Sequence, residues 1–308
     1  MEKRMYDFTP PRASRRSAPA ARRPRKRRRK KHFFSTACLT ACLILALACG
    51  AARLSDSLKS AARSGINIVS SMLPVDLGGA WDADTRAAVE QLAGEYPEAR
   101  AMLETPDNWP ADVAALAARN PEALPFVLAY PDIRTNPPAS RVEEAAQGVF
   151  PALYQWDTRW GCADYGGSIV ALSGCGPTAL SIVTCGLTGS ADWTPAAIAA
   201  WSQGNGYAGS FGTSWELMSD GCTRFGIYGE ELPLTESAVT QALAEGHPVI
   251  CAMRPGDFTT SGHFIVLTGV EDGKIRLVDP NSPARTAELW EYSRLEPQIK
   301  NLWVYTAG

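Results

Sequence analysis

The chain has 308 residues and 45% of them are hydrophobic, which is ample for one well-buried domain with accessory segments and excludes a largely disordered chain. The net charge of −2 conceals an asymmetry, since residues 1–31 hold 14 of the 30 Lys and Arg but only two of the 32 Asp and Glu. The remaining residues therefore form an acidic body joined to a basic tail, and each part needs its own explanation.

The basic tail ends in RRPRKRRRKK (residues 22–31), a pattern that also occurs in nucleic-acid contacts and localisation signals. It is followed, however, by 20 uncharged residues, 33–52, which as a helix would span about 30 Å, the thickness of a hydrocarbon core. We therefore expect 1–32 to be a cytoplasmic tail and 33–52 a transmembrane signal anchor, with no nucleic-acid partner. By the positive-inside rule, the rest of the chain is extracytoplasmic, as in a single-pass protein of the cell membrane. A cleaved signal peptide is the alternative.

Two segments separate the predicted anchor from the rest of the body. Residues 53–89 mix Ser, Gly, Ala and charged residues and are typical of a linker. Residues 90–149 are rich in Ala and interrupted by prolines, so they predict a series of short helices, in which Asn108 and Asn120 precede prolines as caps. Because this region shows no constellation of titratable residues, we interpret it as a helical spacer subdomain; a pro-region and a partner-binding module remain alternatives.

The last segment, 150–308, has an α+β pattern in which helices come first and strands follow. Helices are predicted in 178–187, 194–206, 214–226 and 235–246, with Thr194 and Thr235 as N-caps. Strands are predicted in 248–253, 263–270, 274–280 and 302–306. The sequence Glu-Asp-Gly-Lys at 271–274 favours a hairpin turn. We expect helices packed on an antiparallel meander.

Cys175 is the candidate nucleophile of this segment. It lies between Gly174 and Gly176 at the start of a predicted helix, where free backbone N–H groups and the helix dipole favour a thiolate. The two glycines are expected to let the backbone approach a substrate and to leave the sulfur exposed. A zinc site is disfavoured because the five body cysteines lack the usual ligand spacing, but disulfides among the other four remain open.

The body contains two histidines that could serve as a general base. His247 is expected in a surface turn between a helix and a strand, whereas His263 opens a predicted strand after a flexible stretch. Asp279 ends the next strand, so it could orient the His263 imidazole across the antiparallel pair. Gln155 is the best side-chain candidate to join the Cys175 N–H as a donor to an oxyanion.

Four motifs in this order are similar to those of the papain-like cysteine peptidases related to bacteriocin-processing peptidases, in a stand-alone branch. The motifs are QWDTRWG (155–161), SGCGPTAL (173–180), GHFIVLTG (262–269) and VDPNS (278–282). The resemblance covers 150–308 and implies a papain-like α+β fold without a metal or an organic cofactor. It implies the roles of nucleophile for Cys175, general base and acid for His263, imidazole orienter for Asp279 and oxyanion donor for Gln155.

The resemblance implies a membrane-anchored, extracytoplasmic cysteine peptidase that acts on a peptide or protein substrate. The sequence contains no phosphate-binding loop of a transporter ATPase, so cleavage of leader peptides after a double glycine does not follow from the resemblance. Two alternatives stay open. One is an amidase or transpeptidase that acts on cell-wall peptides with the same triad, and the other is a catalytically idle papain-like surface binding module.

Overall fold

The computed structural model describes residues 75, 77–210 and 212–308, which all belong to one compact unit, Lys59–Gly308. The predicted cytoplasmic tail, the predicted anchor at 33–52 and most of the predicted linker lie outside the described residues. Among the helices that the structure does describe, none is long and apolar enough to cross a membrane. The topology of the chain in a membrane therefore stays a prediction from the sequence.

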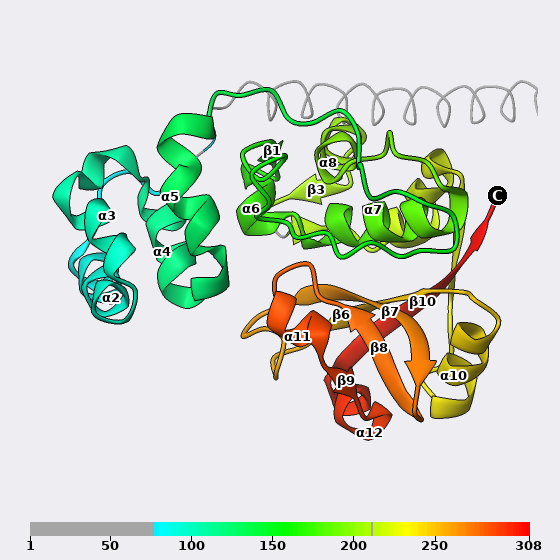
Figure 1. Cartoon of the computed structure of the whole chain (residues 1–308). Helices are drawn as coiled ribbons and strands as arrows, with labels where there is room; N and C mark the ends of the chain where they lie inside the picture. The colour runs from blue at the N-terminus through cyan, green and yellow to red at the C-terminus, as the bar shows by residue number, and fades with distance from the viewer. Residues whose placement is uncertain (1–74, 76, 211) are drawn as a thin grey trace, which may run out of the picture. The chain divides into compact units, whose positions relative to one another are not determined.

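Within the helical segment, residues 77–148, short helices between 83 and 133 alternate between α and 3-10 geometry (Figure 1). The α-helices are α2 (Ala83–Glu95), α3 (Arg100–Glu104), α4 (Ala111–Arg119) and α5 (Leu124–Ile133). The 3-10 helices are η1 (Pro97–Ala99), η2 (Pro106–Asn108) and η3 (Pro121–Ala123). Each 3-10 helix begins with a proline, whose fixed φ suits the first helical position.

The helical segment differs from the sequence prediction at two points. Helix α2 begins at Ala83, inside the predicted linker 53–89, because the Asp82 side chain caps it by accepting from the Thr85 N–H at 2.7 Å. Asn120 accepts a cap hydrogen bond from the Glu122 N–H as expected, whereas Asn108 ends η2 and caps nothing. Position 110, a proline, is the N-cap of α4.

Helices of the second half of the chain include those predicted at 178–187, 194–206 and 235–246. The helices of this half are α6 (Val170–Ser173), α7 (Cys175–Thr188), α8 (Pro195–Gly204), α9 (Glu216–Ser219), η4 (Gly221–Phe225), α10 (Glu236–Ala244), α11 (Pro283–Ala287), α12 (Tyr292–Leu295) and η5 (Glu296–Gln298). Of these, α6, α11, α12 and η5 were not predicted. Thr194 and Thr235 cap α8 and α10 through their side chains. The predicted helix 214–226 is instead two short pieces, α9 and η4, since Gly221 and Gly226 interrupt and end it.

The described residues 149–210 and 212–308 build an antiparallel six-stranded sheet in the order β5-β10-β6-β7-β8-β9. Its strands are β5 (Ile227–Glu231), β6 (Val249–Met253), β7 (His263–Glu271), β8 (Lys274–Val278), β9 (Leu289–Trp290) and β10 (Ile299–Ala307). Two small hairpins, β1 (Asp164–Tyr165) with β2 (Ser168–Ile169) and β3 (Ala208–Gly209) with β4 (Gly212–Thr213), lie outside it. The expected meander is therefore right only for β6 to β8, because β10 inserts between β6 and an unpredicted strand, β5, and a second unpredicted strand, β9, pairs with β8.

The turn between β7 and β8 is the predicted one, because Asp272 and Gly273 both have positive φ, 52° and 77°. Such a pair of angles is what a tight hairpin turn with the native strand twist requires.

The central strands are buried on both faces, and alternate residues enter different cores. Ile250 and Val266 face the core that contains α7 and α8, whereas Cys251 and Ile265 face the core that contains α10 and α12. This double burial explains why β6 consists of five consecutive buried residues. It fixes the register of β6, β7 and β8, and therefore the place where each of these strands ends.

Candidate active site

Cys175 is the first residue of α7, and Gly174 occupies the N-cap position. The helix starts two residues before Pro177, so the thiol lies directly at the helix N-terminus. Cys175 is partly exposed, whereas most of the helix behind it is buried in the sheet core. The first N–H groups of a helix have no intrahelical acceptor, so this position offers donors and a positive dipole end to a thiolate or an oxyanion.

The glycines beside Cys175 also have a packing reason in the protein, which the sequence analysis did not identify. A side chain at Gly174 would lie 2.6 Å from the carbonyl oxygen of Val170. A side chain at Gly176 would overlap the side chain of Thr213. Both positions therefore exclude any residue larger than glycine in this backbone arrangement.

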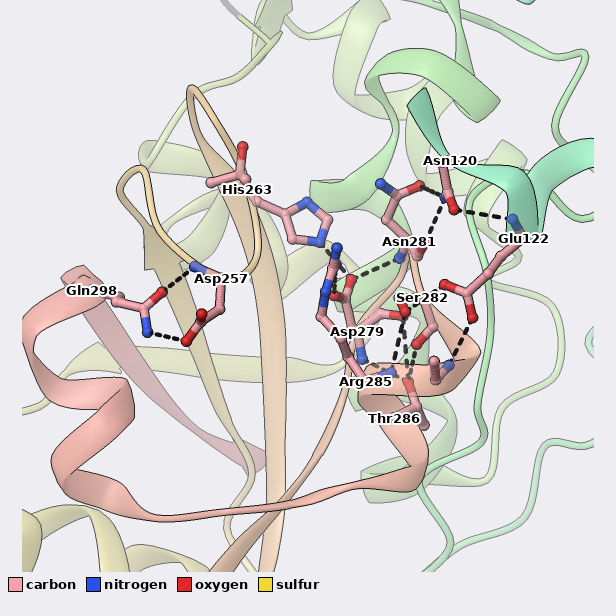
Figure 2. Close-up of polar contacts among 12 residues, drawn as sticks. Asn120, Glu122, Asp257, His263, Asp279, Asn281, Ser282, Arg285, Thr286 and Gln298 are labelled. Carbon is pink, nitrogen blue, oxygen red and sulfur yellow. Dashed lines mark hydrogen bonds and ion pairs between the residues drawn. The ribbon is translucent and has the colours of Figure 1, made fainter. Parts of the chain in front are cut away.

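His263 and Asp279 are brought together by the neighbouring strands β7 and β8. His263 is the first residue of β7 and is 8% exposed, whereas Asp279 follows β8 directly and is fully buried. The Nε2 atom of His263 lies 2.6 Å from Oδ1 of Asp279 (Figure 2). The pairing of Val266 with Val278 in the two strands explains why the two side chains meet at this end of the sheet.

His263 also interacts with Cys175. Because Nε2 is bound to Asp279, the other ring nitrogen, Nδ1, is left for the thiol. Burial lowers the pKa of the imidazole, but the Asp279 carboxylate and the Cys175 side chain together raise it further, to about 10. The pKa of Asp279 is lowered in turn: burial acts against this, and the charge and hydrogen bond of His263 outweigh burial. The geometry thus favours an imidazolium that lies between the Asp279 carboxylate and the Cys175 side chain.

The Asp279 carboxylate has two more donors, which the sequence analysis did not identify. Oδ1 accepts from the Asn281 backbone N–H at 2.8 Å, and Oδ2 accepts from the Arg285 guanidinium at 2.6 Å (Figure 2). Arg285 reaches this position because Ser282 caps the short helix α11 by accepting from its N–H. The Ser-Pro pair at 282–283, a helix-start signal, could have indicated this helix but not the partner of its arginine.

Gln155 is buried, with 5% of its surface exposed, and lines a hollow together with Cys175 and His263. Its Nε2 donates to the Ala171 carbonyl oxygen at 2.8 Å, and its Oε1 has no hydrogen-bond partner. An amide nitrogen carries two hydrogens, so one remains for an oxyanion. The Gln155 backbone N–H donates to the Pro280 carbonyl at 2.8 Å, which ties this residue to the segment after Asp279.

Two adjoining hollows meet at Cys175 and His263. The first, of about 750 Å³, is also lined by Thr213, Trp215, Arg254 and Lys300. The second, of about 480 Å³, is also lined by Arg119, Asn120, Gln155, Asn281 and Arg285. Residues of the loop 254–262 border both of them. The two hollows, together called the groove, share Cys175 and His263 in their lining.

The other cysteines and His247 do not take part in this site. The five cysteines of the described residues are free thiols, so the disulfides left open by the sequence do not form among them. Burial raises the pKa of Cys162, Cys185 and Cys222 to about 11 and that of Cys251 further. His247 lies in a turn after α10, 3.7 Å from Glu245.

Comparison with known proteins identifies the family of the chain. No curated protein matches the chain. Among solved structures, the chain is similar to the peptidase domain of Streptococcus ComA, described as a bi-functional ABC transporter involved in a quorum sensing pathway. The sequence identity is 14% and the TM-score 0.36, over 44% of this chain and 93% of that domain. The model of the Peptidase_C39-like family matches residues 149–308, just over half of the chain. The chain therefore belongs to the Peptidase_C39-like family of cysteine peptidases.

Proposed function

We propose that the chain hydrolyses peptide bonds with Cys175 as nucleophile, His263 as general acid and base, and Asp279 as the group that orients the imidazole. The observation that carries the proposal is the 2.6 Å contact between His263 Nε2 and Asp279 Oδ1, which leaves Nδ1 to the thiol at the tip of α7. Gln155 and the Cys175 N–H are the proposed oxyanion donors.

In the proposed reaction, the Cys175 thiolate attacks the carbonyl carbon of the scissile amide, and the carbonyl oxygen becomes an oxyanion. When this intermediate collapses, the C–N bond breaks and the His263 imidazolium gives its proton to the departing amine. The acyl group is then held as a thioester. Neutral His263 takes a proton from water as the water attacks the thioester, and collapse releases the acid and restores the thiolate–imidazolium pair.

The proposed location is the outer side of the cell membrane, with residues 33–52 as the anchor. The support is the uncharged stretch of 20 residues directly after the basic tail. Protease added to intact cells is expected to degrade the body and to spare the tail. Degradation of the tail alone would show the opposite orientation, with the tail outside the cell and the body in the cytoplasm.

The peptidase activity is tested by incubating the full chain in detergent with a peptide library and, in parallel, with a cell-wall digest. Wild-type protein is expected to produce new amino termini from linear peptides, and Cys175→Ala is expected to produce none at an unchanged melting temperature. Release of fragments from the cell-wall digest alone would instead favour the amidase reading. If neither wild type nor Cys175→Ala turns over the peptide library or the cell-wall digest, the result would favour the idle binding module.

A further inference from the structure

The helical segment binds directly to the loop that carries Asp279. Asn120 Nδ2 donates to the carbonyl oxygen of Asn281 at 2.8 Å, and to its Oδ1 at 3.1 Å. The Glu122 carboxylate accepts from the Ser282 hydroxyl at 2.5 Å and from the Ala284 N–H at 2.8 Å. Figure 2 shows Asn120 and Glu122 on one side of this loop and His263 on the other. These contacts join residues about 160 positions apart in the chain.

The atoms that Asn120 and Glu122 hold are the ones that shape the environment of Asp279. Asn281, whose carbonyl is bound by Asn120, donates its own N–H to Asp279 Oδ1. Ser282, whose hydroxyl is bound by Glu122, is the N-cap of α11, and α11 supplies Arg285 to Asp279 Oδ2. The contact of Asn120 therefore reaches the Asp279 carboxylate through Asn281 alone. The contact of Glu122 reaches it through Ser282 and the short helix α11.

The same segment also supports the nucleophile side of the site. Ile169, in β2, and Ala171, in α6, come shortly before Cys175 and belong to the same buried core as Leu124 and Val127 of α5. A side chain at Gly161 would contact Phe126 at 2.6 Å, so α5 lies close against the chain that leads from Gln155 to Cys175. Helices α4 and α5 are therefore packed against both halves of the candidate site.

We propose that Asn120 and Glu122 are positioning residues of the peptidase, which fix the loop 279–285 so that Asp279 keeps His263 charged and oriented. The helical segment is then a working part of the catalytic unit and not a spacer. This inference rests on the proposed roles of Cys175, His263 and Asp279.

The test measures the alkylation of Cys175 by iodoacetamide between pH 5 and 10 in the full chain, a reaction that needs no peptide substrate. Loosening the loop is expected to lower the pKa of His263, so the thiolate loses its imidazolium partner at neutral pH. A thiol without such a partner is mostly protonated near pH 6.5. Glu122→Ala and Asn120→Ala are therefore expected to slow alkylation at least about fivefold near pH 6.5 and to match wild type near pH 10.

Two further variants separate positioning from folding. Glu90→Ala removes an exposed carboxylate from α2 in the same segment and is expected to leave the profile unchanged. Glu122→Gln keeps one acceptor oxygen and is expected to give an intermediate profile. The inference is overturned if both alanine variants follow the wild-type profile, or if they lose reactivity equally at every pH. If wild-type Cys175 reacts no faster than the other cysteines, the proposed triad fails first and the positioning role falls with it.

A second observation, independent of these contacts, concerns the charge of the groove. Although residues 32–308 hold 30 acidic and 16 basic residues, the basic side chains Arg119, Arg254 and Lys300 line the two hollows. None of the ion pairs among the described residues includes these three side chains. The acidic residue of the lining, Asp257, is neutralised by Arg294 at 2.8 Å.

The placement of these cations points to the charge of the substrate. Arg119, which ends α4, lines one of the two hollows that meet at Cys175, while Arg254 and Lys300 line the other. Arg254 donates to the Ile299 carbonyl and Lys300 lies over the Trp215 ring at 5.2 Å, so both are held beside the groove. We infer that the groove selects peptides with acidic side chains on both sides of the scissile bond.

Two reagents of similar size and different charge test this inference without a known substrate. In about 0.01 M salt, where the screening length is about 30 Å, the rate ratio of iodoacetate to iodoacetamide at Cys175 reports the local charge. Arg119→Glu/Lys300→Glu is expected to lower that ratio at least about fivefold, and about 1 M salt is expected to abolish the difference. Arg100→Glu, in α3, is the control away from the groove and reverses one charge where the double variant reverses two.

An unchanged ratio in the double variant would overturn the inference on substrate charge. So would a fall of the same size in Arg100→Glu, because the effect would then be one of total charge. A lowered ratio together with slower cleavage of Glu-containing library peptides, relative to their Gln counterparts, is the supporting result. Failure of Cys175 to react selectively with either reagent would count against the proposed peptidase site and, with it, the inference.

Discussion

Asp279→Asn is the substitution that most directly tests the electrostatics of the site. It removes one charge and keeps the size of the side chain, so the Asn281 N–H retains an acceptor. The His263 imidazolium loses its anionic partner at 2.6 Å, and the Arg285 guanidinium loses its partner at the same distance. The change therefore acts on the pKa of His263 with little change of shape.

The magnitude follows from the worth of a hydrogen bond to a charged group, about 1.5–3 kcal/mol, which corresponds to about one to two pH units in the titration of His263. In the wild type, the pKa of His263 is raised to about 10. The folded state thus binds this proton more tightly than the unfolded chain. The resulting stabilisation is complete below about pH 6.5, the pKa in the unfolded chain, and is lost as the pH rises towards 10.

Two measurements detect the lowered pKa of His263 in Asp279→Asn. The alkaline limb of kcat/KM against pH is expected to move down by about one to two pH units in Asp279→Asn, with a loss of kcat of about a hundredfold or more. The wild-type free energy of unfolding, from denaturant titrations, is expected to fall between pH 6.5 and 10, and the fall in the variant is expected to be smaller by about 1.5–3 kcal/mol. An alkaline limb at the same pH in both proteins would refute the assignment of Asp279 as the partner that charges His263.

Three further predictions concern residues around the nucleophile. Iodoacetamide at pH 7 is expected to label Cys175 at least about a hundredfold faster than Cys162, because burial raises the pKa of Cys162 to about 11. Peptide mapping by mass spectrometry measures the two labelling rates, and equal rates would contradict the prediction. Gln155→Ala is expected to lower kcat by about 10² to 10³ with little change in KM; an unchanged kcat would remove Gln155 from the oxyanion site. Gly176→Ala is expected to lower the free energy of unfolding by about 1–3 kcal/mol, because the new methyl group overlaps the Thr213 side chain. Adding Thr213→Ala is expected to restore part of this loss. An unchanged free energy of unfolding in Gly176→Ala would show that the backbone can shift to accommodate the methyl group.

The residues of the candidate site were predictable from the sequence because each belongs to a local pattern. Cys175 lies at the start of a predicted helix, His263 begins an apolar strand and Asp279 ends the next strand. A hairpin between those two strands, marked by Asp272 and Gly273, is enough to bring His263 and Asp279 together. Short-range rules therefore located these three positions, and the fold only had to bring α7 to the same edge.

The features that were not predicted depend on contacts between distant segments. Strand β5 has one buried residue in five, so its sequence lacks the alternation that marks a strand, and its pairing with β10 fixes it as one. The Asp279–Arg285 pair depends on the position of a five-residue helix. The contacts of Asn120 and Glu122 with the loop 279–285 span about 160 residues and leave no periodic trace in the sequence.

The central claim is that Cys175 forms a covalent thioester with the peptide it cleaves. It is tested most directly by acid-quenching the full chain within milliseconds of mixing with the library peptides that it cleaves fastest, followed by mass spectrometry of the fragment that contains Cys175. The expected result is an acyl adduct on Cys175 that matches the amino-terminal product and that is absent in Cys175→Ala. Continued hydrolysis by Cys175→Ala, or turnover by wild type with no adduct at any time, would contradict the account.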